Sequence, residues 1–333
     1  MIRFWLTMIG FTPFLLIGGS QKRAVPLAPV PSIALHIDAH PIPNPIVKTE
    51  LPFAFVKAWT LSSPNRDFGS VSALLRDSNG FTAISDHGAV VRFKLSADNA
   101  VFDASLAPLP RGCAADELKT SRDVESVSRD PRTGEVLFGF EWSNMICRSD
   151  MKLRAALRVS HPALMRNWPI LNGAEALVTL SDGRMLIFAE NSQSEGATSP
   201  LLIFEGDPTR RGARATELSY RPPAGFRPTD AVQLPDGRLA IINRRYQFPL
   251  NFSAVITTVK LNDIKPGAIV SGTIAAWLDQ PSIAENYEAI TVSQNGARTF
   301  VWLMSDDNFI ALQSTNLVLF EVVSPKSLSA KTN

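Results

Sequence analysis

Short apolar runs alternate with turn residues along most of the chain, and many of them come in pairs around a glycine-containing turn. In one pair, the apolar run 176–180 leads through Ser181-Asp182-Gly183 into the apolar run 185–189. Two strand-length runs around such a step predict a β-hairpin, because glycine supplies the positive φ that a tight turn needs. Comparable pairs surround four more turns, at Asn79-Gly80, Thr133-Gly134, Asp236-Gly237 and Asn295-Gly296.

An acidic residue opens the first strand in four of these hairpins. The four acids follow one another at intervals of about 50 to 60 residues, and they are Glu125, Glu175, Asp230 and Glu288. Ser72 holds that place in the first hairpin. Two more strand-length runs follow most hairpins, and repeats of this content and period are typical of a β-propeller.

The pattern therefore predicts an all-β fold, a β-propeller of four-stranded antiparallel blades. A direct count gives five blades, and a sixth built from a Pro-rich segment near the N-terminus is the alternative. The last repeat lacks an outer strand, which residues 53–61 can supply. Strands from the two ends of the chain would then close the ring and remove an exposed sheet edge.

Composition divides the chain into four segments. Residues 1–20 join Arg3 to an apolar stretch that is short for a membrane span, which is typical of a signal peptide; an uncleaved N-terminal anchor is the alternative. Residues 21–51 are rich in proline and predict a linker or an arm on the domain surface. Residues 52–325 form the propeller and residues 326–333 a C-terminal tail. We therefore expect an exported protein, periplasmic or secreted.

Charge and cysteine content narrow the possible partners. The 333 residues carry a net charge of +2, so nothing in the composition favours nucleic acid or an anionic membrane. After removal of the signal we expect no membrane association, a monomer, and a small anionic or ester ligand. The two cysteines, Cys113 and Cys147, pair as a disulfide in an oxidising compartment or stay as two buried thiols; both readings are open.

The hairpin geometry brings two positions of each repeat to one mouth of the central channel. The first two strands are antiparallel, so the start of the first lies beside the end of the second. The first strand of a propeller blade is innermost, so both positions surround the channel opening. The second strands thereby add Asp86, Glu141, Glu190, Asp306 and Asp307 to the four acids above, with Arg122, Arg227, Arg244 and Arg245 as counter-charges.

Crowded carboxylates of this kind suit a divalent cation. Calcium takes about six to eight oxygen ligands, and the candidate ligands are Asp86, Glu125, Glu175, Asp230, Glu288 and Asp306. Arginine binds phosphate or carboxylate through paired hydrogen bonds. The catalytic hypothesis joins Glu125, Glu175 and Asp230 to Arg244 and Arg245. The structural alternative is that these acids accept hydrogen bonds from loop amides or pair with the arginines.

Other chemistries have little support in the sequence. It contains no G-x-S-x-G elbow, Walker A sequence, H-E-x-x-H pair or Rossmann glycine pattern. Among the four histidines only His87 falls at the predicted mouth, where a surface or turn role is the simpler interpretation.

The repeats resemble the phytase-like propeller family described as "esterase-like activity of phytase". The resemblance covers roughly residues 65–320 and rests on short pieces in a fixed order: 81–86, 124–127, 173–177, 227–232, 234–238, 243–245, 287–290 and 304–309. It implies a propeller, export, and hydrolysis of a phosphoester or ester.

Three functions follow from these expectations. The first is a metal-dependent hydrolase of phosphoesters or carboxyl esters that acts at the acidic mouth. The second is a non-catalytic exported propeller that binds a ligand or cation there. The third is a lactonase-like hydrolase, which would also use a central cation.

Overall fold

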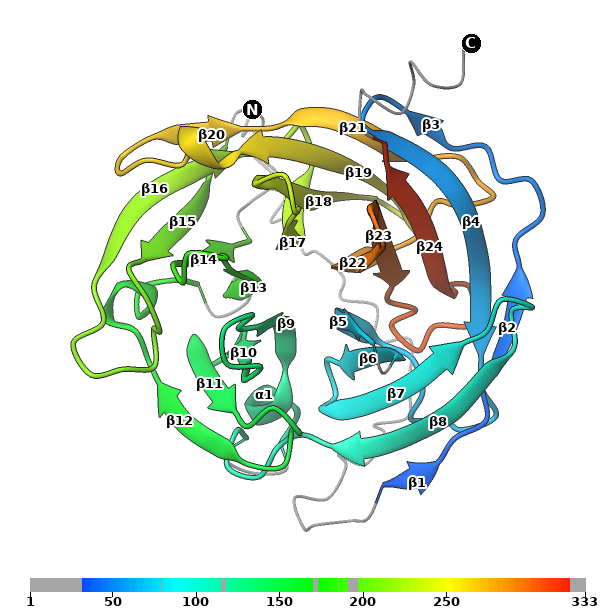
Figure 1. Ribbon diagram of the computed structural model, residues 1–333, viewed down its shortest axis with the longest axis horizontal. Coiled ribbons are helices and arrows are strands. Elements are labelled where there is room, and N and C mark those ends of the chain that lie inside the picture. The colour runs from blue at the N-terminus through cyan, green and yellow to red at the C-terminus, as the bar shows by residue number, and fades with distance from the viewer. Residues whose placement is uncertain (1–31, 79, 115–117, 170–172, 191–196, 324–333) are drawn as a thin grey trace, which may run out of the picture.

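Five sheets surround a central axis, each with its inner strand at the channel (Figure 1). This computed structural model describes residues 32–78, 80–114, 118–169, 173–190 and 197–323. The fold is a five-bladed β-propeller, as predicted, and no sixth blade occurs among these residues. The predicted signal segment and C-terminal tail lie outside them.

Each blade has four successive strands from the channel outward. The inner strands of blades 1 to 5 are β5 (Val71–Asp77), β9 (Val124–Arg129), β13 (Ala174–Thr179), β17 (Arg227–Gln233) and β22 (Tyr287–Asn295). The second strands are β6 (Gly80–Ser85), β10 (Val136–Phe140), β14 (Met185–Ala189), β18 (Arg238–Gln247) and β23 (Arg298–Ser305). The third strands are β7 (Ala89–Leu95), β11 (Met145–Ser149), β15 (Ser199–Phe204), β19 (Asn251–Lys260) and β24 (Thr315–Val322). The fourth strands are β8 (Val101–Pro108), β12 (Ala156–Ser160), β16 (Ala215–Arg221), β21 (Thr273–Leu278) and β4 (Phe53–Ser62).

Blade 5 joins the two ends of the chain. Its outer strand β4 pairs antiparallel with β24, in a register that runs from Phe53 opposite Val322 to Leu61 opposite Thr315. This confirms the predicted closure by N- and C-terminal strands. Among the described residues, helix is confined to α1 (Lys119–Arg122) and the 3-10 turns η1 (Ala163–Met165) and η2 (Leu261–Asp263). None of the described helices is long and apolar enough to cross a membrane.

The described part of the Pro-rich segment, residues 32–51, lies on the outside of the ring. It adds β1 (Ile33–Ala34) to blade 1, β2 (Asp38–Pro41) to blade 5 and β3 (Lys48–Thr49) to blade 4. Blade 3 gains a fifth strand, β20 (Ile269–Ser271), which pairs parallel with β16. In the chain, β20 lies between β19 and β21 of blade 4. These edge strands were not predicted. Proline is compatible with them because an edge strand needs to pair on one side only.

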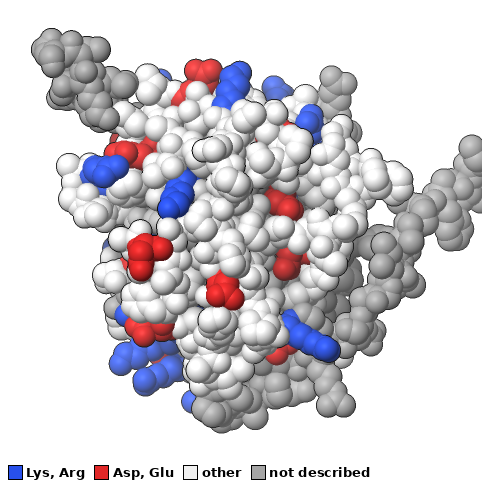
Figure 2. Space-filling model, turned by 90° about the vertical axis from the view of Figure 1, so that its right-hand side faces the viewer, with Lys and Arg blue, Asp and Glu red and all other residues white. Residues whose placement is uncertain are grey.

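Figure 2 shows the outer wall on the side of β2 and β4, where lysines, arginines and acids are scattered among uncharged residues. No single sign of charge dominates this face. The interior is apolar, and the hydrophobic clusters fill the wedges between neighbouring blades. The rigid ring of packed blades therefore holds the channel mouth in place.

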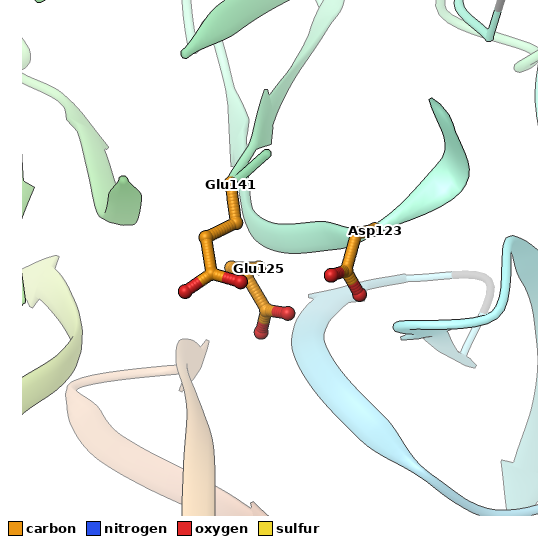
Figure 3. A group of neighbouring side chains, drawn as sticks. All are labelled: Asp123, Glu125 and Glu141. Atoms are coloured by element: carbon orange, nitrogen blue, oxygen red, sulfur yellow. The ribbon is translucent and has the colours of Figure 1, made fainter. Parts of the chain in front are cut away.

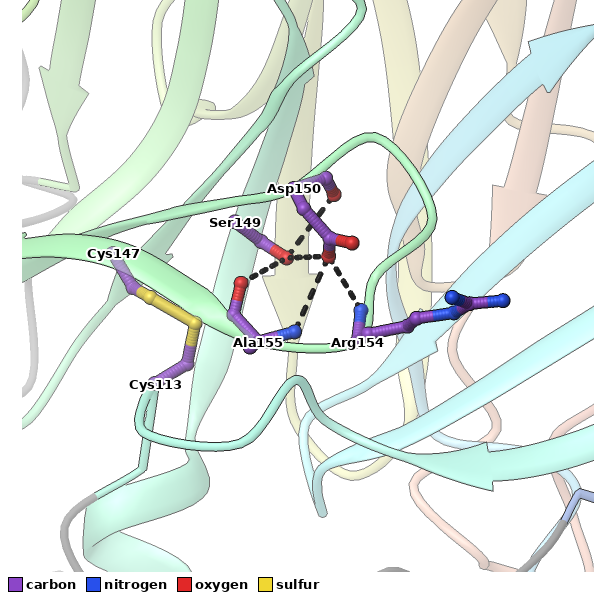
Figure 4. Close-up of a disulfide and its surroundings, with 6 residues drawn as sticks. All are labelled: Cys113, Cys147, Ser149, Asp150, Arg154 and Ala155. Atoms are coloured by element: carbon purple, nitrogen blue, oxygen red, sulfur yellow. Dashed lines mark hydrogen bonds between the residues drawn. A yellow bond between two sulfur atoms is a disulfide. The ribbon is translucent and has the colours of Figure 1, made fainter.

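A disulfide joins Cys113, in the connection between blades 1 and 2, to Cys147 on β11, with their Cα atoms 5.4 Å apart (Figure 4). Beside it, the Asp150 carboxylate accepts hydrogen bonds from the backbone amides of Arg154 and Ala155. Of the two alternatives for the cysteines, a disulfide or two buried thiols, the structure contains the disulfide. The crosslink fixes the segment that leads into the first acidic strand of the mouth.

Candidate functional site

One bulge near the start of every inner strand shapes the mouth. In each blade the register shifts by one residue, so that one inner-strand residue is left without a partner on the second strand. A β-bulge bends the strand and re-aims the side chain of the extra residue. The five bulged residues are Ser72, Glu125, Glu175, Thr229 and Glu288.

In blade 4 the bulged residue is Thr229, and Asp230 lies one residue beyond it, opposite Ile242. The buried Asp230 carboxylate accepts hydrogen bonds from the backbone amides of Ala231 and Ile290, both at 2.8 Å. Its burial raises the pKa of the carboxyl well above the ordinary value, and the two amide bonds counter this in part. Asp230 thus ties blade 4 to the inner strand of blade 5, and the structure does not group it with the bulged acids.

Three carboxylates of blade 2 converge in Figure 3: Asp123, Glu125 and Glu141. One oxygen from each lies within 4.8 Å of the others. Glu125 is the bulged residue, Asp123 comes directly before β9, and Glu141 follows the end of β10. Asp123 was not among the predicted acids. Its signal in the sequence was the Asp-x-Glu spacing, which puts two carboxylates on the same side of an extended strand.

An arginine network holds the opposite side of the mouth. Arg244, on β18, donates from one terminal nitrogen to Glu190 at 2.8 Å and from the other to Glu288 at 2.7 Å and Asn286 at 2.8 Å. Arg227 donates to the second oxygen of Glu190 at 2.7 Å. Burial by itself lowers the pKa of Arg244, but the carboxylates around it outweigh burial and raise it. The guanidinium therefore stays charged and is occupied by protein groups.

Asn286 extends this network toward Asp306. Its amide nitrogen donates to Glu288 at 3.0 Å and to Asp306 at 3.3 Å, and the side chain is fully buried. Asp306 is buried beside it and also accepts a hydrogen bond from the amide of Asn308. The next residue, Asp307, bonds instead to the backbone of Ser70 and so links blade 5 to blade 1.

Two predicted mouth residues have mainly local partners. Arg245 stacks on Phe226, with the guanidinium carbon 4.8 Å from the ring centre, and its Nε donates to Ser253 at 3.2 Å. His87 forms a close contact with Asp86 through Nδ1, and its ring meets Phe309 edge to face at 4.9 Å. Asp86 thus lies at the predicted turn with an imidazole beside it.

Two buried acids of the mouth, Glu125 and Glu175, resist ionisation. Burial raises the pKa of Glu125 well above its ordinary value, and the charges of Asp123, Glu175 and Glu288 raise it further. Burial likewise raises the pKa of Glu175, with Glu190 and Glu141 adding to it and Arg244 opposing it. Such shifts show that the carboxylates lie close enough to repel one another across the channel.

The donor set fits a hard divalent cation. Carboxylate oxygens are the ligands that calcium and magnesium prefer, whereas zinc favours histidine and cysteine. The three oxygens of Asp123, Glu125 and Glu141 lie close enough together to be shared by one ion. A cation there would also relieve the repulsion that raises the pKa of Glu125.

A sequence-family profile, phytase-like and described as "Esterase-like activity of phytase", matches residues 66–309. The chain belongs to this family. The match spans all five inner strands of the phytase-like propeller and the acids that surround its mouth. The search of curated proteins gave no match.

The chain is also similar to solved structures, among them two at low sequence identity. The Neurospora crassa Pan2 WD40 domain is similar at a TM-score of 0.37 and 11% identity, over 84% of this chain and 96% of that one. A chain of the nidogen/laminin complex is similar at a TM-score of 0.39 and 12% identity, over 85% and 96%.

Proposed function

We propose that this phytase-like propeller is an exported hydrolase of phosphoesters or carboxyl esters that depends on a divalent cation, with calcium as the favoured ion. The single observation that carries the proposal is the convergence of Asp123, Glu125 and Glu141 on one point of a mouth already crowded with buried acids. Such a group is costly to keep without a cation, because each carboxylate loses water and gains like-charged neighbours.

The residues divide the mouth into two sides. Asp123, Glu125 and Glu141 would hold the cation, and a bound cation supplies polarisation of the phosphoryl or carbonyl oxygen of an ester. Glu175 and Glu288 continue the acidic wall toward Arg244. The Arg244 network keeps Glu190 and Glu288 fixed and thereby sets the shape of the wall against which the substrate would lie.

Hydrolysis of a panel of p-nitrophenyl phosphate, p-nitrophenyl acetate and a simple lactone, each with calcium and with EDTA, tests the proposal. We expect calcium-dependent activity on an ester, lost in Glu125→Gln and Glu141→Gln. Glu217→Gln, an exposed acid on the outer strand β16, is the matched control and should keep it. Activity that survives both EDTA and removal of the two mouth acids contradicts the proposal, and a strong preference for the lactone would select the lactonase-like reading.

Export is the second part of the proposal. It is supported by the signal-like composition of residues 1–20 and by the Cys113–Cys147 disulfide, since disulfides persist in oxidising compartments. Cell fractionation with mass spectrometry of the N-terminus tests it. Recovery of the chain with residues 1–20 intact in the cytoplasm would contradict it.

A second candidate function, a cation-binding propeller without turnover, is favoured by one observation. The two arginines predicted to hold an anionic substrate are engaged elsewhere: Arg244 by Glu190, Glu288 and Asn286, and Arg245 by Phe226. Calorimetric binding of calcium that disappears in Glu125→Gln, together with no turnover of any ester in the panel, would select this function.

A further inference from the structure

Several exposed apolar side chains lie in the turns between the second and third strands, and in blades 2 and 5 these turns also carry mouth acids. These turns join the second strand of a blade to the third, so they lie at the channel mouth. Five large hydrophobic residues in them are exposed, and we call them the apolar collar: Trp142, Phe248, Leu250, Ile310 and Leu312. Trp142 directly follows Glu141, and Ile310 lies four residues after Asp306.

The collar is most prominent on blade 4, where the hairpin extends beyond the level of the acids. Arg244 pairs with Arg227 at the start of the inner strand, yet β18 and β19 continue for three more pairs, up to Gln247 opposite Asn251. At about 3.3 Å per strand residue, Phe248 lies on the order of 13 Å along the strand from Arg244. The hairpin thus projects from the rim of the mouth.

Internal contacts hold the tip of this hairpin. Tyr246 packs against Phe252 with ring centres 5.0 Å apart, and its hydroxyl donates to the carbonyl of Pro249 at 2.9 Å. Phe248 takes no part in these contacts and is 79% exposed, the same value as Leu312 on blade 5. No other large hydrophobic residue of the described chain is more exposed. Exposed apolar groups beside a polar site are typical of a surface that binds a partly apolar ligand.

We propose that the ligand of the mouth is amphiphilic, with a phosphate or carboxyl ester head held at the acidic centre and an alkyl, acyl or aryl body lying against the apolar collar. This inference rests on the proposed function and adds to it the class of substrate. The same chemistry occurs in a dissolved amphiphile and in the surface of a lipid bilayer. Binding of a phosphate head is expected to need the cation, because the acids alone would repel an anion.

Binding of methylphosphonate and octylphosphonate, measured by calorimetry with excess calcium, tests the apolar part without any need for turnover. Octylphosphonate is used below its aggregation concentration. We expect it to bind about tenfold or more tightly than methylphosphonate, since burial of apolar surface favours the longer chain. Phe248→Ser and Leu312→Ser should remove most of this difference. Phe102→Ser, at an exposed aromatic on the outer strand β8, is the matched control and should keep it.

Two further arms separate the possible outcomes. Co-sedimentation with anionic phospholipid vesicles in calcium, without binding of the dissolved octylphosphonate, would support the same chemistry and assign the ligand to a lipid surface. Equal binding of both phosphonates, or binding of neither together with no vesicle binding, overturns the inference.

Hydrolysis of p-nitrophenyl acetate and octanoate is measured in parallel. Chain-dependent binding without hydrolysis leaves the inference in place and contradicts the hydrolase. Hydrolysis of both esters at equal kcat/KM, with equal binding of the two phosphonates, would support the hydrolase and contradict the amphiphilic ligand.

Discussion

Acidic side chains at the two ends of the propeller lie in opposite electrostatic environments. At the mouth, burial and neighbouring carboxylates raise the pKa of Glu125, Glu175 and Asp306 well above ordinary values. At the opposite end, in the turns of the inner hairpins, acids have lowered pKa values. Burial by itself raises the pKa of Asp130, but hydrogen bonds from Arg132 and Arg148 outweigh it and bring the pKa to about 2.

The difference comes from where the partner of each acid lies in the sequence. At the turn end an arginine follows the aspartate after one intervening residue, as in Asp182 with Arg184 and Asp236 with Arg238. Each pair forms within its own turn, whatever the other blades do. The mouth acids come from several blades, and apart from the three converging carboxylates of blade 2 they meet one another because the ring closes. The acids at the turn end are therefore paired with arginines nearby in the sequence, whereas the mouth brings several carboxylates close to one another.

Removing the central arginine of the turn end should have the largest effect. Arg148 is buried and bonds to Asp130 at 2.9 Å and to Glu135. We expect Arg148→Met to lower the free energy of unfolding by about 3 kcal/mol or more, because it leaves the buried Asp130 carboxylate with Arg132 alone and removes the partner of Glu135. Urea unfolding measures this. A change below about 1 kcal/mol would show that the turn end is not held by this pairing.

The two ends should respond to pH in opposite directions. The mouth acids have folded-state pKa values above the ordinary 4.5, so the folded state binds more protons than the unfolded state and stability falls as pH rises above that value. Asp130 has a folded-state pKa of about 2 against an ordinary 3.8, so its contribution is lost as pH falls through this window.

Thermal unfolding without calcium should therefore show a maximum between these ranges, with a loss on the order of 2 kcal/mol toward pH 8. Excess calcium should remove most of the loss on the alkaline side. A stability that rises steadily from pH 5 to about 8 would contradict the repulsion that we infer at the mouth.

Neutralising one mouth acid should stabilise the cation-free protein. Glu175→Gln removes a buried carboxyl group whose pKa is raised by burial and by the charges of Glu190 and Glu141. We expect a gain of about 1 kcal/mol at pH 8 and weaker calcium binding, measured by urea unfolding and by calorimetry. Glu217→Gln on the outer wall is the control and should leave both unchanged. A clear loss of stability in Glu175→Gln would mean that its carboxylate is already satisfied.

The smallest effect is expected at an exposed pair of the turn end. Asp236 and Arg238 lie in the turn of blade 4, partly open to solvent. Asp236→Asn should change the free energy of unfolding by less than about 1 kcal/mol, since exposed ion pairs contribute little. Its measurement beside Glu175→Gln shows whether position in the ring, rather than acidity as such, decides the sign of the effect.

Local patterns in the sequence were enough to predict the blades, and they failed where register mattered. Each glycine turn fixes a hairpin, so the five inner hairpins and the closing strand 53–61 could be foreseen. The bulge at Thr229 could not, because nothing in Arg-Pro-Thr-Asp says which residue is left unpaired. The sequence prediction therefore placed Asp230 at the repeat position that Thr229 occupies in the structure. A shift of one residue in a strand turns a side chain to the other face, and here it moved a predicted ligand into a contact between blades.

Contacts between distant segments were also beyond reach. Asp123 precedes the repeat motif and joins Glu125 and Glu141 only when β9 and β10 pair. The engagement of Arg244 depends on Glu190 from blade 3 and Glu288 from blade 5, residues that no local spacing connects. The arm strands β1, β2 and β3 are too short to leave a periodic signal.

The pairing of β4 with β24 limits when the ring can close, because the two strands lie far apart in the chain. Thr60 and Asn316, which bond across this pair, are 256 residues apart. At synthesis rates of about 5–20 residues per second, the early strand emerges many seconds before its partner exists. Until then blade 5 lacks its third strand, β24, and the ring cannot close. The ring can therefore close only near the end of synthesis, after the strands of the other four blades have been made.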